Sequence, residues 1–126
     1  STNKKLTKDT DIYLVDTYGE ASKFYNLSSV SFVGGSVINH GGQNPLEPAR
    51  LGNYIINGPN ISNFNEVYRF LSKNNMSSTT SNIHKIKRII EQKLNKKISN
   101  LNKTKLLKIG ENILNKNMIY INKYIK

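Results

Sequence analysis

Three glycine-containing turns stand out in this sequence as places where a ligand could be bound. Tyr18-Gly19-Glu20, Gly34-Gly35-Ser36 and Asn57-Gly58-Pro59 each follow a short apolar run. Glycine allows the backbone to approach a ligand closely and to adopt positive φ. The free N–H groups of a helix that begins after such a turn favour an anion, so the pattern indicates a pocket for a phosphorylated ligand.

The turn at Gly34 leads into the richest candidate segment, which reads His40-Gly41-Gly42-Gln43-Asn44-Pro45-Leu46-Glu47-Pro48. Pro45 favours the first turn of a helix, and Asn44 can cap that helix. Glu47 would then lie near the mouth of the pocket, where a carboxylate can accept two hydrogen bonds from the vicinal hydroxyls of a ribose. A carboxylate at a helix start also compensates the helix dipole, so these residues alone leave both roles open.

The apolar pattern predicts the elements that must position these residues. Short runs rich in strand formers predict buried strands, and amphipathic stretches between them predict helices. The expected strands are Asp11–Asp16, Val30–Val33, Tyr54–Asn57 and a short final one at 76–80. Strands that alternate with helices indicate an α/β fold, with a Rossmann-like parallel sheet and helices on both faces. In such sheets ligands bind beyond the carboxyl ends of the strands, which is where the glycine turns lie.

The helices are expected between these strands and throughout the C-terminal third of the chain. Asn63, followed three residues later by Glu66, resembles a capping box at the start of one helix. From Asn82 onward the pattern is helical to the end, with Gly110 as a weak point.

The chain is basic, with 19 Lys and Arg against 8 Asp and Glu and a formal net charge of +11. This balance favours anionic partners such as nucleic acid, a membrane surface or a phosphorylated ligand. The lysines after Asn82 fall in amphipathic patterns, so they also fit simple solvation of helix faces. The absence of cysteine excludes disulfides and thiolate metal sites, and the two histidines, His40 and His84, are isolated. No metal or cofactor is therefore expected, and no apolar run approaches the roughly 20 residues of a membrane-spanning helix.

Residues 16–67 resemble the donor-binding domain of 3-deoxy-D-manno-octulosonic acid (Kdo) transferases. The matching elements occur in the family's order and spacing, and they are Asp16–Glu20, Phe32–Ser36, His40–Pro48, Gly58-Pro59 and Asn63-Phe64. The chain departs from the family pattern at Tyr18, where Met is usual, and at Gln43, where His is usual. The second departure argues against an obligatory histidine at that position. Members of this family transfer Kdo from CMP-Kdo to lipid A precursor in lipopolysaccharide synthesis, and they have the GT-B fold of two Rossmann-like domains.

The resemblance implies which residues bind the CMP-Kdo donor. The expected donor-binding residues are Gly19, Glu20, Gly34, Gly35, Ser36, His40, Asn44 and Glu47. Glu47 would bind the ribose hydroxyls, and Asn44 would order the turn that precedes it. His40 either contacts the donor or bonds the backbone of its own loop.

The resemblance also implies that this chain is one part of an enzyme. The family's catalytic carboxylate and lipid acceptor surface belong to an N-terminal domain near a membrane anchor, so the chain is expected to be inactive alone. Residues 1–80 would form the CMP-sugar-binding core, with further strands upstream, and 81–126 would form basic helices that pack on the same domain. The whole glycosyltransferase is expected at the cytoplasmic face of the bacterial inner membrane, with this part of it soluble.

Other partners and functions follow from the same residues. The basic helices suit an anionic membrane surface, and the apolar residues Ile119, Ile121, Tyr124 and Ile125 suit pairing with a second copy. Another GT-B enzyme, such as a UDP-sugar transferase or an epimerase, would share the glycine turns and the ribose-binding acid. It would lack the run from His40 to Pro48. A nucleic-acid-binding module fits the charge, but no aromatic residue interrupts the lysines before Tyr120, so no nucleic-acid partner is expected.

Overall fold

The computed structural model describes residues 7–94 and 99–124. Within them the elements follow in the order α1 (Ala21–Leu27), β1 (Val30–Val33), α2 (Leu46–Arg50), β2 (Tyr54–Asn57), the 3₁₀ turn η1 (Ser62–Phe64), α3 (Asn65–Lys73), β3 (Ser77–Thr79), α4 (Ile83–Leu94) and α5 (Ser99–Tyr124). The strands expected at Val30–Val33, Tyr54–Asn57 and 76–80 are therefore confirmed.

The three strands form a parallel sheet in the order β1-β2-β3. All four residues of the central strand β2 are buried, because a parallel strand with helices on both sides has no solvent face. The core consists mainly of β2 and the elements packed against it, and its buried members are Val33, Ala49, Ile55, Tyr68, Leu71 and Met76. These apolar contacts fix the sheet on which the loops are carried.

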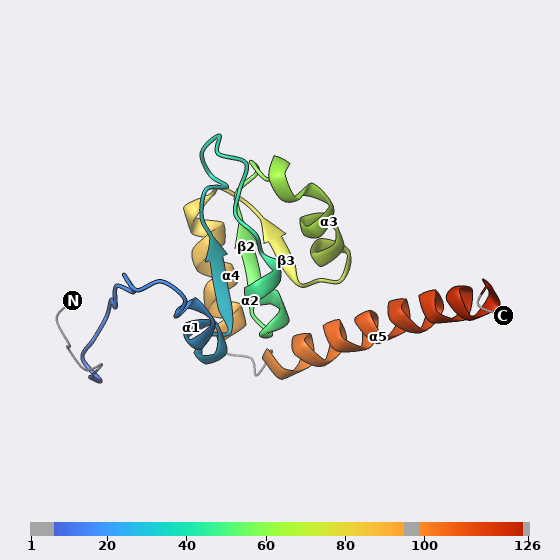
Figure 1. Ribbon diagram of the computed structural model, residues 1–126. Coiled ribbons are helices and arrows are strands. Elements are labelled where there is room, and N and C mark those ends of the chain that lie inside the picture. Colours follow the sequence, from blue (N-terminus) through green and yellow to red (C-terminus); the bar gives the residue numbers. More distant parts are fainter. Residues whose placement is uncertain (1–6, 95–98, 125–126) are drawn as a thin grey trace.

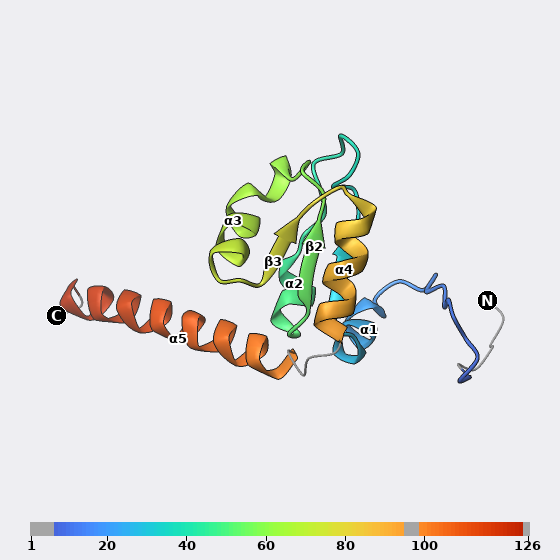
Figure 2. The ribbon, with the colours of Figure 1, turned by 180° about the vertical axis from the view of Figure 1, so that it is seen from behind.

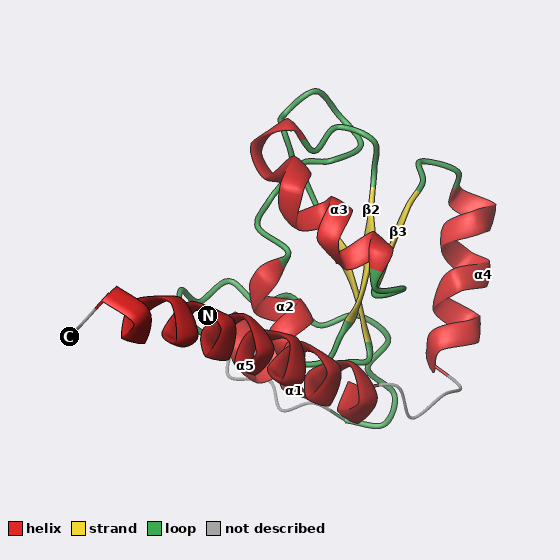
Figure 3. Ribbon diagram, turned by 90° about the vertical axis from the view of Figure 1, so that its right-hand side faces the viewer, coloured by secondary structure: helices red, strands yellow, loops and turns green. Residues whose placement is uncertain are grey.

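Helices cover both faces of the sheet, as predicted. Figure 3 shows α2 and α3 on one side of β2 and β3 and α4 on the other. Tyr68 and Leu71 are the buried residues of α3. On the opposite face, the Lys93 ammonium of α4 lies 4.1 Å from the centre of the Tyr54 ring. This α/β arrangement brings the carboxyl ends of the strands, and the loops that follow them, to one end of the sheet (Figure 1).

The long helix α5 starts against the α/β core and then extends away from it (Figure 2). In its first turns the Asn102 amide lies 3.4 Å from the carbonyl of Gly52, and the Lys105 ammonium donates to the carbonyl of Asn74 at 2.7 Å. Further along, Ile119, Ile121 and Tyr124 are exposed. Pairing of these residues with a second copy stays a prediction, and Ile125 lies outside the described residues.

Two expectations about local structure are wrong. Asp11–Asp16 is not a strand; Ile12 and Leu14 are 90% and 81% exposed. A run of this hydrophobicity suits a strand covered on both faces. Here most of the run is exposed, and Tyr13 stacks on Phe24 of α1. Asn63 does not cap α3: it lies in η1, and Phe64 occupies the N-cap position of α3. The Asn63 side chain instead donates to the carbonyl of His40.

Candidate functional site

A cavity of about 560 Å³ lies between the turn before α1, the helix α1 itself and the start of α2. Thr17, Gly19 and Tyr25 line one part of it, and Glu47 lines another. Glu47 is exposed and lies in the first turn of α2. The cavity therefore combines apolar and aromatic walls with one free carboxylate, a combination suited to a small polar ligand that carries a ring.

The α1 wall of the cavity is held by a buried asparagine. Asn53 is fully buried, and its amide nitrogen donates to the carbonyl of Tyr25 at 2.6 Å. Its amide oxygen accepts hydrogen bonds from the hydroxyls of Ser28 and Ser31. Because a buried amide is costly unless it is paired, this network ties the end of α1 to the residue before β2. Sequence reasoning missed Asn53, because a lone Asn before a strand carries no periodic signal.

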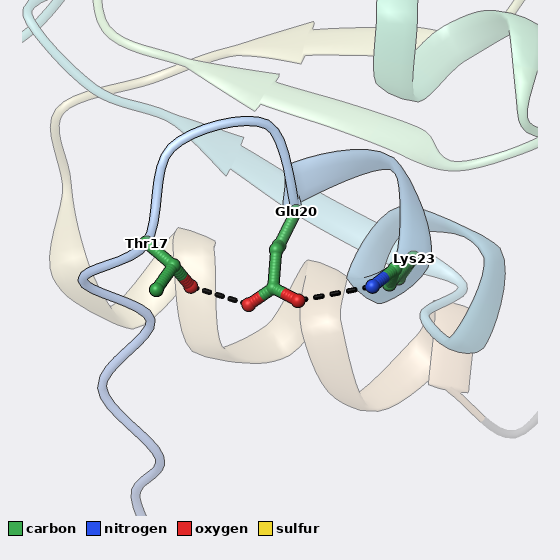
Figure 4. A network of polar contacts seen from close by, with 3 residues as sticks. All are labelled: Thr17, Glu20 and Lys23. Atoms are coloured by element: carbon green, nitrogen blue, oxygen red, sulfur yellow. Dashed lines mark hydrogen bonds and ion pairs between the residues drawn. The ribbon is translucent and has the colours of Figure 1, made fainter. Parts of the chain in front are cut away.

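Glu20 forms a small polar network at the start of α1, shown in Figure 4. One carboxylate oxygen accepts a hydrogen bond from the hydroxyl of Thr17, and the other accepts one from Lys23 at 3.0 Å. These contacts stabilise the charged form, so the bond from Thr17 and then the interaction with Lys23 lower the pKa of Glu20 below 4.5. Glu20 is thus engaged with its own turn, next to Gly19 in the cavity wall.

Replacing Thr17 by Val is expected to raise the pKa of Glu20 toward 4.5, because the largest stabilising contact of the carboxylate is removed. The pKa is lower in the folded than in the unfolded chain. The contact therefore contributes stability above the unfolded pKa, and this is lost as the pH falls through the folded value. Side-chain NMR titration of Glu20 measures the shift. Thr10→Val is the control, because Thr10 bonds to Thr7 instead; an unchanged Glu20 pKa in Thr17→Val would contradict the assigned contact.

The loop after β1 is joined to the loop after β2 by Ser36. Its hydroxyl donates to the carbonyl of Val33 at 2.6 Å and accepts from the N–H of Gly58 at 2.8 Å. The carbonyl of Ser36 also accepts from the N–H of Asn60 at 2.9 Å. Ser36 is fully buried, so these contacts hold two strand-end loops together.

The segment from Gly41 to Glu47 is held from the side of η1 and α3. The N–H of Asn63 donates to the carbonyl of Gly41 at 3.1 Å, and the hydroxyl of Tyr68 donates to the carbonyl of Gln43 at 2.9 Å. The amide oxygen of Asn44 accepts from the N–H of Leu46 at 3.0 Å, so Asn44 contacts the first residue of α2, although Pro45 and not Asn44 occupies the N-cap position. The helical spacing of Tyr68 indicates that its ring is buried, but it does not indicate the partner of its hydroxyl.

The structure brings together only some of the residues expected at a donor site. Gly19 and Glu47 line the same cavity, although they belong to turns that are far apart in the sequence. Five other expected residues lie outside the walls of this cavity, in the loop between β1 and α2: Gly34, Gly35, Ser36, His40 and Asn44. The exposed side chain of His40 lies against Gly35, where a Cβ would approach its Cδ2 to 3.1 Å.

Neither a metal cluster nor a membrane-spanning helix is found in the part of the chain that is described. Residues 7–94 and 99–124 contain no group of three or more His, Cys, Asp or Glu side chains that could hold a metal ion. None of the helices within these ranges is long and apolar enough to cross a membrane.

Comparison with known proteins identifies the family. No family model matches the chain. A 3-deoxy-D-manno-octulosonic acid transferase from Haemophilus influenzae is 37% identical over 100 residues, which cover 79% of this chain and 23% of that protein. The chain belongs to the Kdo transferase family. A second transferase of the same name, from Rickettsia prowazekii, is 35% identical over 82 residues, covering 65% of this chain and 18% of that protein.

A solved structure supports the same assignment at the level of the fold. The crystal structure of the C-terminal CMP-Kdo binding domain of WaaA from Acinetobacter baumannii is similar, with a TM-score of 0.63 and 34% sequence identity. The match covers 68% of this chain and 45% of that one. The predicted fold class, a parallel α/β domain of a GT-B Kdo transferase, is therefore confirmed. The chain spans about a quarter of the length of the Haemophilus influenzae relative, 23%.

Proposed function

We propose that this chain binds the CMP part of CMP-Kdo and supplies the donor half-site of a Kdo transferase. The observation that carries this proposal is the exposed carboxylate of Glu47, which faces the same cavity as Gly19. Both residues belong to motifs that the chain shares with the family. A carboxylate at this place can accept hydrogen bonds from the two ribose hydroxyls, and such charge-assisted bonds are the stronger ones in proteins.

The remaining walls of the cavity suit the rest of a nucleotide. Phe24 and Tyr25 of α1 contribute aromatic rings to it, and a base can stack on such a face. Gly19, with φ of 84°, adopts a left-handed backbone conformation that only glycine reaches easily, and it leaves this wall of the cavity without a side chain.

For the whole protein we propose transfer of Kdo from CMP-Kdo to lipid A precursor in lipopolysaccharide synthesis, at the cytoplasmic face of the inner membrane. The support is the 37% identity to a Kdo transferase and the likeness to a CMP-Kdo binding domain. In this proposal, the residues named above bind the donor, and the acceptor surface and the catalytic carboxylate belong to another domain of the enzyme.

Titration of the chain with CMP, followed by backbone NMR, tests the proposed donor site. Shifts are expected at Gly19, in the 34–36 turn and at Glu47, with weaker binding of UMP. Preference for UMP would favour another nucleotide-sugar enzyme. Shifts confined to the lysines of α4 and α5, or affinity for random DNA without any response to CMP, would contradict the donor site.

The basic helices are proposed to attract an anionic membrane surface near which the acceptor lipid lies. α5 carries Lys103, Lys105, Lys108, Lys116 and Lys123 against a single acid, Glu111. Exposed lysines near an anionic lipid surface each contribute up to about 1 kcal/mol of attraction. The chain is therefore expected to sediment with anionic vesicles at low salt, to be released by added salt and to ignore neutral vesicles. Equal sedimentation with neutral vesicles, or none with anionic ones, would contradict this role.

A further inference from the structure

We propose that Tyr68 is a positioning residue for the donor site, because its hydroxyl holds the backbone of the loop that sets the position of Glu47. The inference rests on the proposed CMP-binding function, and it assigns to a core tyrosine of α3 a role that no cavity contact reveals.

The contact joins the hydrophobic core to the main chain of the loop. Tyr68 is 1% exposed and belongs to the buried core cluster. Its hydroxyl donates to the carbonyl of Gln43 at 2.9 Å, whereas the rest of Gln43 is exposed. Burial raises the pKa of Tyr68 to about 12, so the hydroxyl keeps its proton and remains a donor throughout the neutral range. The anchor therefore acts on the backbone and does not depend on the identity of residue 43.

Three residues separate the anchored Gln43 from Glu47, and the segment they form is constrained by the following contacts. The amide oxygen of Asn44 accepts from the N–H of Leu46 at 3.0 Å. Pro45 is fully buried, and its carbonyl accepts from the N–H of Ala49 at 3.1 Å, which closes the first turn of α2. Glu47 lies in that turn. A displacement of the Gln43 carbonyl would therefore be passed to Glu47 through a short and closely packed segment.

The segment that contains η1 and α3 holds the same loop at a second point. The N–H of Asn63 donates to the carbonyl of Gly41 at 3.1 Å, two residues before the carbonyl that Tyr68 holds. Asn63 holds the loop where it enters, and Tyr68 holds it where it continues into α2. With Tyr68 removed, the start of α2 would lose the nearer of these two contacts.

Tyr54 offers a closely matched control within the same chain. It is also a buried tyrosine, 6% exposed, and its hydroxyl lies 2.7 Å from the hydroxyl of Ser78. That contact joins β2 to β3 and does not involve the loop. Tyr68→Phe and Tyr54→Phe thus remove the same atom from a buried ring, and only the first frees the backbone before Glu47.

The experiment measures both variants in the intact chain by amide hydrogen exchange and by CMP affinity. In Tyr68→Phe, exchange is expected to accelerate several-fold at Leu46 and Ala49, whose N–H groups donate to Asn44 and to the carbonyl of Pro45. CMP affinity is expected to fall about 3- to 10-fold, the range of one net hydrogen bond. In Tyr54→Phe neither quantity should change by more than about two-fold, although both variants lose similar stability, which denaturant unfolding verifies.

Equal effects of the two substitutions would overturn the proposal, since a general loss of stability would then explain both. Unchanged exchange and affinity in Tyr68→Phe would also overturn it. If the unsubstituted chain does not bind CMP, the proposed function fails instead. The difference in exchange between the two variants then decides by itself whether Tyr68 holds the loop.

Discussion

Replacing Glu47 by Gln is expected to lower the affinity of the chain for CMP by about 10- to 100-fold. The carboxylate lines the cavity from the first turn of α2 and is exposed to a ligand. Hydrogen bonds to a charged group contribute about 1.5–3 kcal/mol, and each 1.4 kcal/mol is a tenfold change in affinity. Gln keeps the size of the side chain but removes the charge and one of the two acceptor oxygens.

The role of Glu47 as a ribose ligand predicts a specific coupling to the sugar hydroxyls. Calorimetry should show that 2′-deoxy-CMP binds the unsubstituted chain about 10-fold more weakly than CMP, because it lacks one hydroxyl that donates to the Glu47 carboxylate. In Glu47→Gln this preference should largely disappear, because its cause has been removed.

Glu66→Gln is the control for this experiment. Glu66 is likewise an exposed acid in the first turn of a helix, on α3, and its replacement should leave CMP affinity unchanged. A preference for CMP over 2′-deoxy-CMP that persists in Glu47→Gln would remove Glu47 from the ribose site. If Glu47→Gln and Glu66→Gln lowered CMP affinity equally, the effect of Glu47 would come from the net charge of the chain and not from a contact with the ribose.

Replacing Gly58 by Ala is expected to destabilise the chain by about 3 kcal/mol, toward the upper end of the usual cost of overpacking a closely packed site. A Cβ at this position would lie 2.2 Å from the carbonyl oxygen of Ser36 and 2.7 Å from the nitrogen of Val37. Both are backbone atoms, so no side-chain rotation can relieve the overlap. The hydrogen bond from the N–H of Gly58 to the Ser36 hydroxyl would be displaced as well.

Urea denaturation of Gly58→Ala and Gly34→Ala measures this difference. Gly34 follows β1 directly, and a Cβ there would meet nothing within 4 Å, so its replacement should change the free energy of unfolding by less than about 1 kcal/mol. Similar stabilities of the two variants would show that the loops after β1 and β2 can separate without cost.

The sequence was sufficient to predict the parallel sheet and the start of α2. The bounds of β1 and β2 follow from compact apolar runs that end at glycine, and the contact of Asn44 with the start of α2 follows from its place before Pro45. These features are local, so neighbouring residues encode them. The run from Ile12 to Val15 has the same apolar pattern, but it does not form a strand. A buried strand also needs a neighbouring strand to pair with and other elements packed on both of its faces.

Sequence alone thus determined the α/β class, the order of helices and strands from α1 onward, and the family that the Gly34–Pro48 segment resembles. Periodicity and motif spacing are properties of short stretches, so they can be read without the fold. Only the tertiary structure decided that Gly19 shares a cavity with Glu47 and that Ser36 joins the turn after β1 to the turn at Gly58. It also revealed Asn53 and Tyr68, whose partners lie 28 and 25 residues away in the chain. Such contacts depend on how the sheet brings distant loops together, and no local pattern records them.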